Sequence, residues 1–362
     1  MDLGIIGLAQ SGKTTVFKAV TRGHAQTGSF GSAEPAIGVV KIPDPRLDEL
    51  AVLIHSKKVT YAEARYLDFP GAFAVRGEGP GGAYLGSVAQ CDALVHVVRA
   101  FRNESVPHPA GSVDPERDIA AVNLELTFAD LATLQNRHDR LEISVRSARP
   151  GEREPGEREL ALVARLREAI EREEPLRAQE LSPEERRTIS GYQLLTLKPL
   201  LLLVNTDEAD AGRADEVAAE YEARWRGPGV AVAALCAKLE QELTELSEDE
   251  AAEFRKDMGL QEGGLDRLLR LSQDVLGLIS ILTVGEQEAR AWAVPGGASA
   301  PEAAGKIHTD MEKGFIRAEV IGWQDLLDCG SYAEARKRGL LRTEGKTYVP
   351  KDGDVVHILF NL

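Results

Sequence analysis

Cysteine is scarce in this sequence, and its placement excludes two kinds of thiol chemistry. The 362 residues contain three cysteines, Cys91, Cys236 and Cys329, and their spacing fits neither a metal site nor a CxxC redox motif. We interpret them as reduced thiols of a cytoplasmic protein, and we expect the first two to pack in a core.

Positive charge is also in short supply. The 43 Lys and Arg residues against 58 Asp and Glu residues give a net charge of −15. An acidic surface of this kind disfavours binding to nucleic acid through electrostatics alone, although a local basic patch is compatible with it. We therefore expect no DNA partner.

Long apolar runs are missing as well. No stretch is long enough to cross a bilayer, and the N-terminus enters the pattern of a buried strand rather than that of a signal peptide. The sequence also lacks an internal repeat, a metal-ligand cluster and a nucleophile triad. We therefore expect no membrane partner.

What the sequence does contain is the pattern of an α/β protein. A chain of 362 residues exceeds what one hydrophobic core usually supports, which predicts two or three domains. Short apolar runs bounded by loop or helical sequence predict a largely parallel sheet with helices on both faces. These runs are residues 3–6, 37–42, 65–67, 93–98, 200–204 and 230–235.

Two stretches depart from this pattern. Residues 123–197 are rich in Leu, Glu, Arg and Ala at helical spacing, with a hydrophilic break at 148–156. This favours an inserted antiparallel arm of two long helices, and two solvated surface helices are the plainer alternative. From residue 279 onward, short strands and turns predict a small separate α+β domain. The expected boundaries are 1–122 and 198–278 for the α/β domain, 123–197 for the arm and 279–362 for the last domain.

The clearest motif lies near the start of the chain. Gly7-Leu-Ala-Gln-Ser-Gly-Lys13-Thr14 matches GxxxxGK[ST] in full, after an expected strand and before an expected helix. In such a P-loop, backbone N–H groups converge on phosphates at the N-terminus of a helix. We expect Lys13 to reach the β- and γ-phosphates and the Thr14 hydroxyl to ligate Mg²⁺.

Two further motifs fit a P-loop protein. Asp68 follows an apolar strand and Gly71 comes three residues later, which is the switch arrangement of GTPase-like proteins. Asp68 would hold Mg²⁺ through water, and the Gly71 amide would sense the γ-phosphate. Asn205 ends another apolar strand, where this fold reads the base, and Glu208 stands where guanine-specific proteins carry Asp. That Asp accepts hydrogen bonds from the N1–H and the 2-amino group of guanine, so guanine selectivity is not secured here.

These motifs, with several longer stretches, resemble the YchF or Obg-like ATPase family of translation-factor-related P-loop proteins. The resemblance covers nearly the whole chain and is most specific in its C-terminal part. The matching stretches are residues 34–40, 43–47, 91–99, 290–292, 304–310, 313–319 and 344–348.

The resemblance implies a P-loop G domain of α/β type with an inserted antiparallel helical coiled-coil arm, plus a C-terminal β-grasp (TGS) domain. It also implies binding of ATP at least as well as GTP, with an NxxE motif that Asn205 and Glu208 match. By analogy with the family, the expected partner is the ribosome or ribosomal RNA, reached through the TGS domain and the arm.

The resemblance assigns two more residues and exposes two departures. Ala72 stands where Ras-like enzymes carry the Gln that orients the attacking water, so another group must take that role. His108 aligns with a loop histidine to which the family assigns it. A surface histidine between two prolines is the alternative interpretation of His108. Ser32 aligns with a switch-I ligand of Mg²⁺. Gln10 replaces the family's usual Asn, and the switch-II stretch after Asp68 is shortened.

The expected site therefore has three parts. His108, Lys13 and Gly71 are assigned to catalysis, and Thr14, Ser32 and Asp68 to Mg²⁺. The nucleotide, ATP or alternatively GTP, is assigned to Ala9, Gln10, Ser11, Gly12, Lys13, Thr14, Thr15, Asn205, Glu208, Cys236 and Ala237.

Two other questions stay open at the level of sequence. A basic cluster at 336–338 with Arg342 and Lys346 suits RNA phosphates, but neighbouring acids favour an ordinary solvated face. The intact Lys13, Thr14 and Asp68 favour a slow ATPase that acts as a nucleotide-dependent switch. Because of Ala72, a nucleotide-binding protein with negligible intrinsic hydrolysis stays open as the second interpretation. A phosphotransferase is the most distant alternative.

Overall fold

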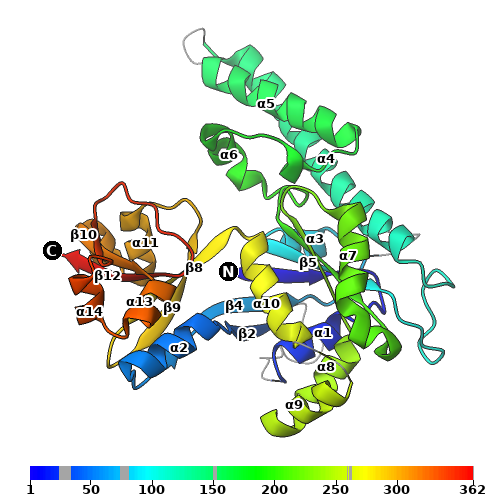
Figure 1. Ribbon diagram of the computed structural model, residues 1–362. Coiled ribbons are helices and arrows are strands. Elements are labelled where there is room, and N and C mark those ends of the chain that lie inside the picture. Colours follow the sequence, from blue (N-terminus) through cyan, green and yellow to red (C-terminus); the bar gives the residue numbers. More distant parts are fainter. Residues whose placement is uncertain (24–33, 74–80, 150–152, 259, 261–262, 362) are drawn as a thin grey trace. The chain divides into compact units, whose positions relative to one another are not determined.

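A computed structural model describes residues 1–23, 34–73, 81–149, 153–258, 260 and 263–361 of the chain (Figure 1). Contacts within the chain divide it into two compact units. The first contains Met1–Gly38 and Arg65–Leu265, and the second contains Val39–Ala64 and Asp266–Leu362. Among the described residues, no helix combines the length and apolar composition needed to cross a membrane.

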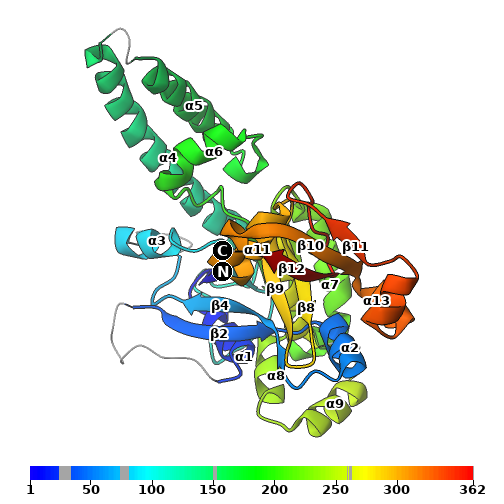
Figure 2. The ribbon, with the colours of Figure 1, turned by 90° about the vertical axis from the view of Figure 1, so that its left-hand side faces the viewer.

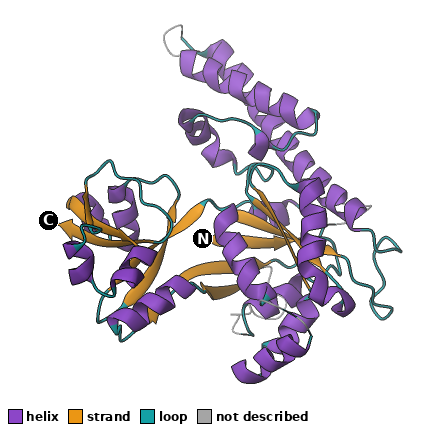
Figure 3. Ribbon diagram, in the orientation of Figure 1, coloured by secondary structure: helices purple, strands orange, loops and turns teal. Residues whose placement is uncertain are grey.

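The first unit is built on a six-stranded sheet of order β2-β4-β1-β5-β6-β7, drawn as orange arrows in Figure 3. Strands β4, β1, β5, β6 and β7 pair in parallel, as the apolar runs predicted. The strands are β1 (Asp2–Ile6), β2 (Ala36–Ile42), β4 (Ala62–Asp68), β5 (Ala93–Arg99), β6 (Leu200–Asn205) and β7 (Val230–Leu235).

Helices surround this sheet because each presents an apolar stripe to it. Val88 of α3 and Val122 of α4 pack in one buried cluster with Ile6 of β1. Tyr221 of α7 packs in another with strand residues of β5, β6 and β7. The helices of this unit outside the arm are α1 (Lys13–Val20), α3 (Gly82–Val88), α7 (Ala214–Trp225), α8 (Ala237–Leu243) and α9 (Glu248–Asp257), with the 3-10 helix η3 (Glu208–Arg213).

Two long helices form the inserted arm, α4 (Pro115–Ser147) and α5 (Arg153–Glu171), which lie side by side in Figures 1 and 2. They are joined along a buried apolar seam that includes Leu134, Leu141 and Leu166. The 3-10 helix η1 (Leu176–Ala178), α6 (Pro183–Ile189) and the 3-10 helix η2 (Ser190–Tyr192) complete this part.

Helix α4 begins earlier than the expected arm because its first turns belong to the core of the sheet domain. Asp114 caps the helix by accepting a hydrogen bond from the Arg117 amide, and Pro115 occupies its first turn. Ile119 and Leu126 are fully buried against the sheet clusters. One helix therefore runs from the sheet domain out into the arm.

Asp130 fixes α4 to the chain that enters β6. Its carboxylate is buried and accepts hydrogen bonds from the Leu195 amide at 2.7 Å, the Thr196 amide at 2.7 Å and the Thr196 hydroxyl at 2.7 Å. A buried carboxylate is tolerated only when its acceptor capacity is met in this way.

The second unit has its own six-stranded sheet, of order β11-β10-β12-β8-β9-β3. Strand β12 pairs in parallel with β8 and antiparallel with β10, so parallel and antiparallel neighbours mix in one sheet. Its strands are β3 (Val59–Thr60), β8 (Leu278–Val284), β9 (Ala289–Pro295), β10 (Phe315–Gly322), β11 (Arg342–Glu344) and β12 (Asp354–Phe360). Its helices are α2 (Pro45–Ile54), α11 (Ala300–Ile307), α12 (Thr309–Lys313), α13 (Trp323–Cys329) and α14 (Tyr332–Lys337), and α10 (Gly264–Val275) lies at the junction of the two units in the chain.

Residues 39–64 belong to the second unit, whereas the sequence-based boundaries placed them in the first domain. Leu47 and Leu50 of α2 share a buried cluster with Leu326 of α13. The Arg46 guanidinium also bonds to Asp44 at 2.8 Å and to Asp352 at 2.6 Å. Local sequence pattern shows that α2 has an apolar face but does not show which core that face joins.

We predict that Asp130→Ala lowers the free energy of unfolding by about 2–4 kcal/mol, because it leaves buried donors at residues 195 and 196 without their acceptor. Urea unfolding monitored by circular dichroism measures the loss. Asp139→Ala, on an exposed part of the same helix, is the matched control and should change stability by less than about 0.5 kcal/mol. Equal effects of the two substitutions would contradict the anchoring role.

Candidate nucleotide site

At two positions, the loop between β1 and α1 adopts a backbone conformation that requires glycine. Gly7 and Gly12 have φ of 145° and 96°, in the region that favours glycine. A Cβ at Gly7 would lie 2.4 Å from the Val97 carbonyl oxygen, and one at Gly12 would lie 2.2 Å from Asn205 Nδ2. The P-loop is therefore pressed against β5 and β6, and its last glycine leads directly into the N-terminus of α1.

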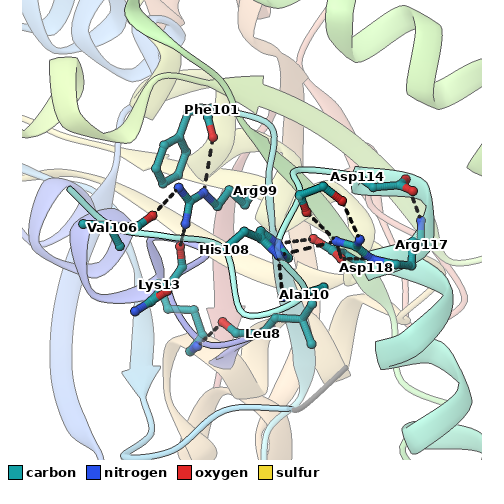
Figure 4. Close-up of polar contacts among 12 residues, drawn as sticks. Leu8, Lys13, Arg99, Phe101, Val106, His108, Ala110, Asp114, Arg117 and Asp118 are labelled. Atoms are coloured by element: carbon teal, nitrogen blue, oxygen red, sulfur yellow. Dashed lines mark hydrogen bonds and ion pairs between the residues drawn. The ribbon is translucent and has the colours of Figure 1, made fainter. Parts of the chain in front are cut away.

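Lys13 lies folded over its own loop. Its Nζ donates to the carbonyl oxygens of Gly7 at 3.2 Å and Leu8 at 2.8 Å, and the residue is only 8% exposed (Figure 4). Burial lowers the pKa of Lys13 to about 8, and the charge of Asp68 partly opposes that shift. A partly desolvated ammonium beside a helix N-terminus is suited to an anionic ligand, which would replace the water it has lost.

Asp68 and Thr14 meet at the carboxyl edge of the sheet. Asp68 ends β4, which is paired with β1, and its Oδ2 accepts a hydrogen bond of 2.8 Å from the Thr14 hydroxyl. Burial raises the pKa of Asp68, while the Thr14 hydrogen bond and the Lys13 charge act in the opposite direction. A hydroxyl and a carboxylate held together supply the oxygen donors that Mg²⁺ prefers, so these residues fit a P-loop magnesium site.

The other expected switch residues are only partly placed. Ser32 lies outside the described residues, as does the 77–79 segment of switch II. Gly71 is exposed with φ of 122°, and Ala72 after it is half-buried. Among the described residues, no group of three or more His, Cys, Asp or Glu side chains forms a separate metal site.

Asn205 joins two loops with its side chain. Its Nδ2 donates to the Ser11 carbonyl at 3.1 Å, and its Oδ1 accepts from the Ala237 amide at 3.0 Å. The residue is buried, so both bonds are shielded from water. Asn205 therefore links the P-loop to the start of α8 through both polar atoms of its side chain.

A pocket of about 430 Å³ opens beside this bridge. It brings together residues that follow β1, β5, β6 and β7, at the edge where parallel α/β sheets bind ligands. Six of the lining residues were expected from the sequence: Gln10, Gly12, Thr15, Asn205, Glu208 and Cys236.

The remaining expected nucleotide residues lie in the P-loop and at α8. Ala9 and Thr14 are exposed, whereas Ser11, Lys13 and Ala237 are buried. Ser11 Oγ is buried without a hydrogen-bond partner, so the loop contains an unsatisfied polar group beside Gly7.

Sequence reasoning missed one wall of the pocket. That wall includes the segment after β5 and the residue after Ala237. Its members are Phe101, Arg102, Asn103, Val106, Thr206, Asp207, Lys238 and Gln241. Their signal was positional: each follows the carboxyl end of a strand that pairs in parallel with its neighbour.

His108 is held by both of its ring nitrogens. Nδ1 accepts from the Ala110 amide at 3.1 Å, which places the proton on Nε2, and Nε2 donates to Asp118 Oδ2 at 2.8 Å (Figure 4). Arg117 braces the same carboxylate at 2.8 Å. The ring is buried, so His108 can orient a water only after it leaves Asp118.

Arg99 connects the loop that carries His108 to the P-loop. Its buried guanidinium donates to the carbonyl oxygens of Val106 at 2.7 Å and Gln10 at 3.5 Å, and it stacks 4.5 Å from the centre of the Phe101 ring. The Arg99 side chain therefore contacts both the P-loop and the 101–108 segment.

The basic cluster of the second unit is paired with acids. Arg336 bonds to Glu319 at 3.0 Å, Arg338 bonds to Glu334 at 3.0 Å, and Arg342 bonds to Glu344 at 3.2 Å. These pairs are mostly exposed and satisfy the charges locally. The geometry agrees with the solvated face that the neighbouring acids favoured.

We predict a pH signature for Lys13 in the nucleotide-free protein. Since its folded pKa lies near 8 and its unfolded value near 10.5, the unfolded state binds the extra proton between these values. The contribution of Lys13 to the free energy of unfolding should therefore rise with pH across this window, by up to about 3 kcal/mol.

Urea unfolding of wild type and Lys13→Met at pH 7 and pH 9.5 measures this contribution. Lys13→Met lacks this titrating group and keeps all the others. The free energy of unfolding of Lys13→Met minus that of wild type should therefore be smaller at pH 9.5 than at pH 7. Lys18→Met, an exposed lysine on the same helix, is the control. A constant difference between wild type and Lys13→Met would exclude the lowered pKa.

Comparisons with known proteins agree over the whole chain. Residues 278–361 match the family model YchF-GTPase_C, described as "Protein of unknown function (DUF933)". The chain is 40% identical to "Ribosome-binding ATPase YchF" of Bacillus subtilis (strain 168) over 371 residues, with 100% of each chain covered. It is 38% identical to the protein of the same name from Escherichia coli O157:H7 over 369 residues, with 99% of each covered.

A solved structure shows the same fold at full length. The structure of the Schizosaccharomyces pombe YchF GTPase superposes with a TM-score of 0.86 at 31% identity, and covers 99% of this chain and 97% of its own. The likeness extends through the P-loop unit, the arm and the C-terminal unit, because nearly the whole of both chains is matched. This chain is therefore a member of the YchF family of P-loop proteins.

Proposed function

We propose that this chain is a Mg²⁺-dependent P-loop nucleoside triphosphatase that hydrolyses ATP and acts as a nucleotide-dependent switch at the ribosome. The arrangement of Lys13, Thr14 and Asp68 around the N-terminus of α1 is the observation that carries the hydrolase proposal. The names of the Bacillus and Escherichia relatives, which describe ribosome-binding ATPases, support the substrate and the partner.

Each site residue has a separate role in the proposed phosphoryl transfer. Backbone N–H groups of the P-loop would cradle the phosphates at the start of α1, and Lys13 would exchange its two carbonyl partners for β- and γ-phosphate oxygens. Thr14 and Asp68 would hold Mg²⁺, with Ser32 as the switch-I ligand, and the ion would neutralise charge between the phosphates. The Gly71 amide would contact the γ-phosphate.

Positioning of the attacking water falls to His108, because Ala72 has no hydrogen-bonding side chain. Release from Asp118 would free Nε2–H, while Nδ1 is the atom that could accept a proton once its bond to Ala110 is broken. The contact of Arg99 with Gln10 gives the P-loop a route to that segment. Hydrolysis therefore requires the 101–108 segment to rearrange after nucleotide binds.

The same contacts favour a second candidate function. A protein whose histidine stays on Asp118 would bind nucleotide and change conformation with negligible intrinsic hydrolysis. Turnover of the purified full-length chain, with and without ribosomes, separates the two. Phosphate release above that of a Lys13→Ala preparation supports the hydrolase, and equal background rates in both conditions support the binding protein. GTP serves as the alternative substrate in the same assay.

The partner surface follows from the domain assignment. We assign residues 279–362 to a TGS domain and propose that this domain, with the α4–α5 arm, contacts the ribosome in the cytoplasm. The ion-paired state of Arg336, Arg338 and Arg342 means that RNA contact there would need those pairs to open. The arm, as a separate projecting helical pair in the first unit, is the simpler contact.

We predict that Lys13→Ala lowers affinity for Mg²⁺ and ATP by at least about 100-fold, because the β- and γ-phosphates lose a buried cation. Isothermal titration calorimetry of nucleotide-free protein measures the change. Lys18→Ala, one turn along α1 and exposed, should bind as wild type does. Unchanged affinity of Lys13→Ala would remove the P-loop assignment.

We predict that His108→Ala lowers kcat at least about tenfold while the Kd for ATP changes less than about threefold, since the ring acts on water rather than on nucleotide. Single-turnover hydrolysis and calorimetry measure the two quantities separately. His357→Ala, an exposed histidine of β12, controls for loss of an imidazole. An unaltered kcat would take His108 out of the mechanism.

A further inference from the structure

Glu208 and Lys238 form an ion pair at the rim of the nucleotide pocket. Lys238 Nζ lies 2.6 Å from Glu208 Oε1, and both residues line the 430 Å³ pocket. Glu208 begins η3 just after β6, and Lys238 lies in the first turn of α8 just after β7. Because β6 and β7 pair in parallel, with Asn205 opposite Leu235, their carboxyl ends deliver the two side chains to one place.

Hydrogen bonds with the neighbouring Asp207 hold the backbone at Glu208 in place. Its amide donates to Asp207 Oδ1 at 2.8 Å, and Asp207 Oδ2 accepts from the Arg102 amide at 3.3 Å. Lys238 starts from the residue next to Ala237, whose amide bonds to Asn205. Both partners of the ion pair are therefore attached to the rigid frame of the pocket, although their ends are exposed.

The pair changes what the Glu208 carboxylate can accept. Guanine presents two donors on one edge, N1–H and the 2-amino group, and a carboxylate receives them best with one oxygen for each donor. Lys238 holds Oε1 in an ion pair, so one guanine donor would have to share that oxygen with the ammonium or displace it. Adenine presents a single amino donor and a bare N1, so one oxygen is enough for it.

We propose that Lys238 is a specificity-determining residue, which disfavours guanine by competing with it for one oxygen of Glu208 at the base end of the pocket. The inference rests on the proposed function, because it requires that this pocket receive a purine nucleotide. It adds a residue outside the NxxE motif, and it assigns the base preference to the pair rather than to the length of Glu208 alone.

The expected size of the effect is limited by the exposure of the pair. A lost hydrogen bond lowers affinity by roughly five- to 100-fold, and a weakened one lowers it by less, because guanine can compete with Lys238 in an exposed ion pair. Removing Lys238 should therefore raise GTP affinity by about fivefold or more, and ATP affinity should stay within about twofold. The ratio of ATP affinity to GTP affinity therefore measures the contribution of Lys238 to base selectivity.

Calorimetric titration of the nucleotide-free full-length chain with Mg²⁺ and ATP or GTP tests the proposal. The variants are Lys238→Met, Glu208→Gln and the double substitution. Glu242→Gln is the matched control, since Glu242 is an exposed acid 3.8 Å from Lys238 on the same helix and lies outside the pocket lining. The exposed positions of all three side chains favour folded variants, which circular dichroism verifies.

Selective ATP binding by wild type, a gain of GTP affinity in Lys238→Met, and loss of that gain in the double variant would support the proposal. An unchanged ratio in Lys238→Met, or a gain that persists without the Glu208 carboxylate, would overturn it and leave the nucleoside triphosphatase proposal intact. A wild-type preference for GTP would overturn it as well. If wild type bound neither nucleotide, the proposed function itself would fail.

Discussion

The nucleotide site depends on the bridge that Asn205 makes between two loops. Its amide holds the Ser11 carbonyl on one side and the Ala237 amide on the other, and both bonds are buried. The bridge joins the loop after β1 to the helix after β7, across strands that are not neighbours in the sheet. Gly12 lies so close to Asn205 that a Cβ there would overlap it. The P-loop and the start of α8 are thereby held in a fixed position relative to each other.

A second set of contacts couples this frame to the parts that would act on nucleotide. Arg99 links the P-loop carbonyl of Gln10 to Val106, and the same segment ends at His108 on Asp118. Asp118 and Asp130 both lie on α4, so the helix that holds the histidine also enters the arm and is tied to the start of β6 through Asp130. One continuous helix therefore contacts both the loop that carries His108 and the core of the arm. This gives a physical connection between the state of the P-loop and the element proposed to meet the ribosome.

Much of the site was predictable because its motifs are local. The P-loop spans eight residues, and Asp68 and Asn205 each end a strand that the apolar pattern reveals. The pocket wall of Phe101 and Lys238 was not predictable in this way, since each residue matters only through the neighbour that folding places beside it. His108 also shows a limit of prediction from sequence. Its alignment suggested a catalytic loop residue, and the structure places both ring nitrogens in hydrogen bonds that a sequence pattern does not encode.

The α/β order of elements, the phosphate loop, the helical arm and the family could be inferred from the amino-acid pattern, because each is encoded in contiguous residues with a fixed period or spacing. Three features required the folded molecule: the core that α2 joins, the hydrogen bonds of Asn205 to two loops, and the ion pair of Glu208 with Lys238. These are contacts between residues far apart in the chain. Their geometry is fixed by the register of parallel strands and by the burial of polar groups that must find partners, and neither is a property of a short segment.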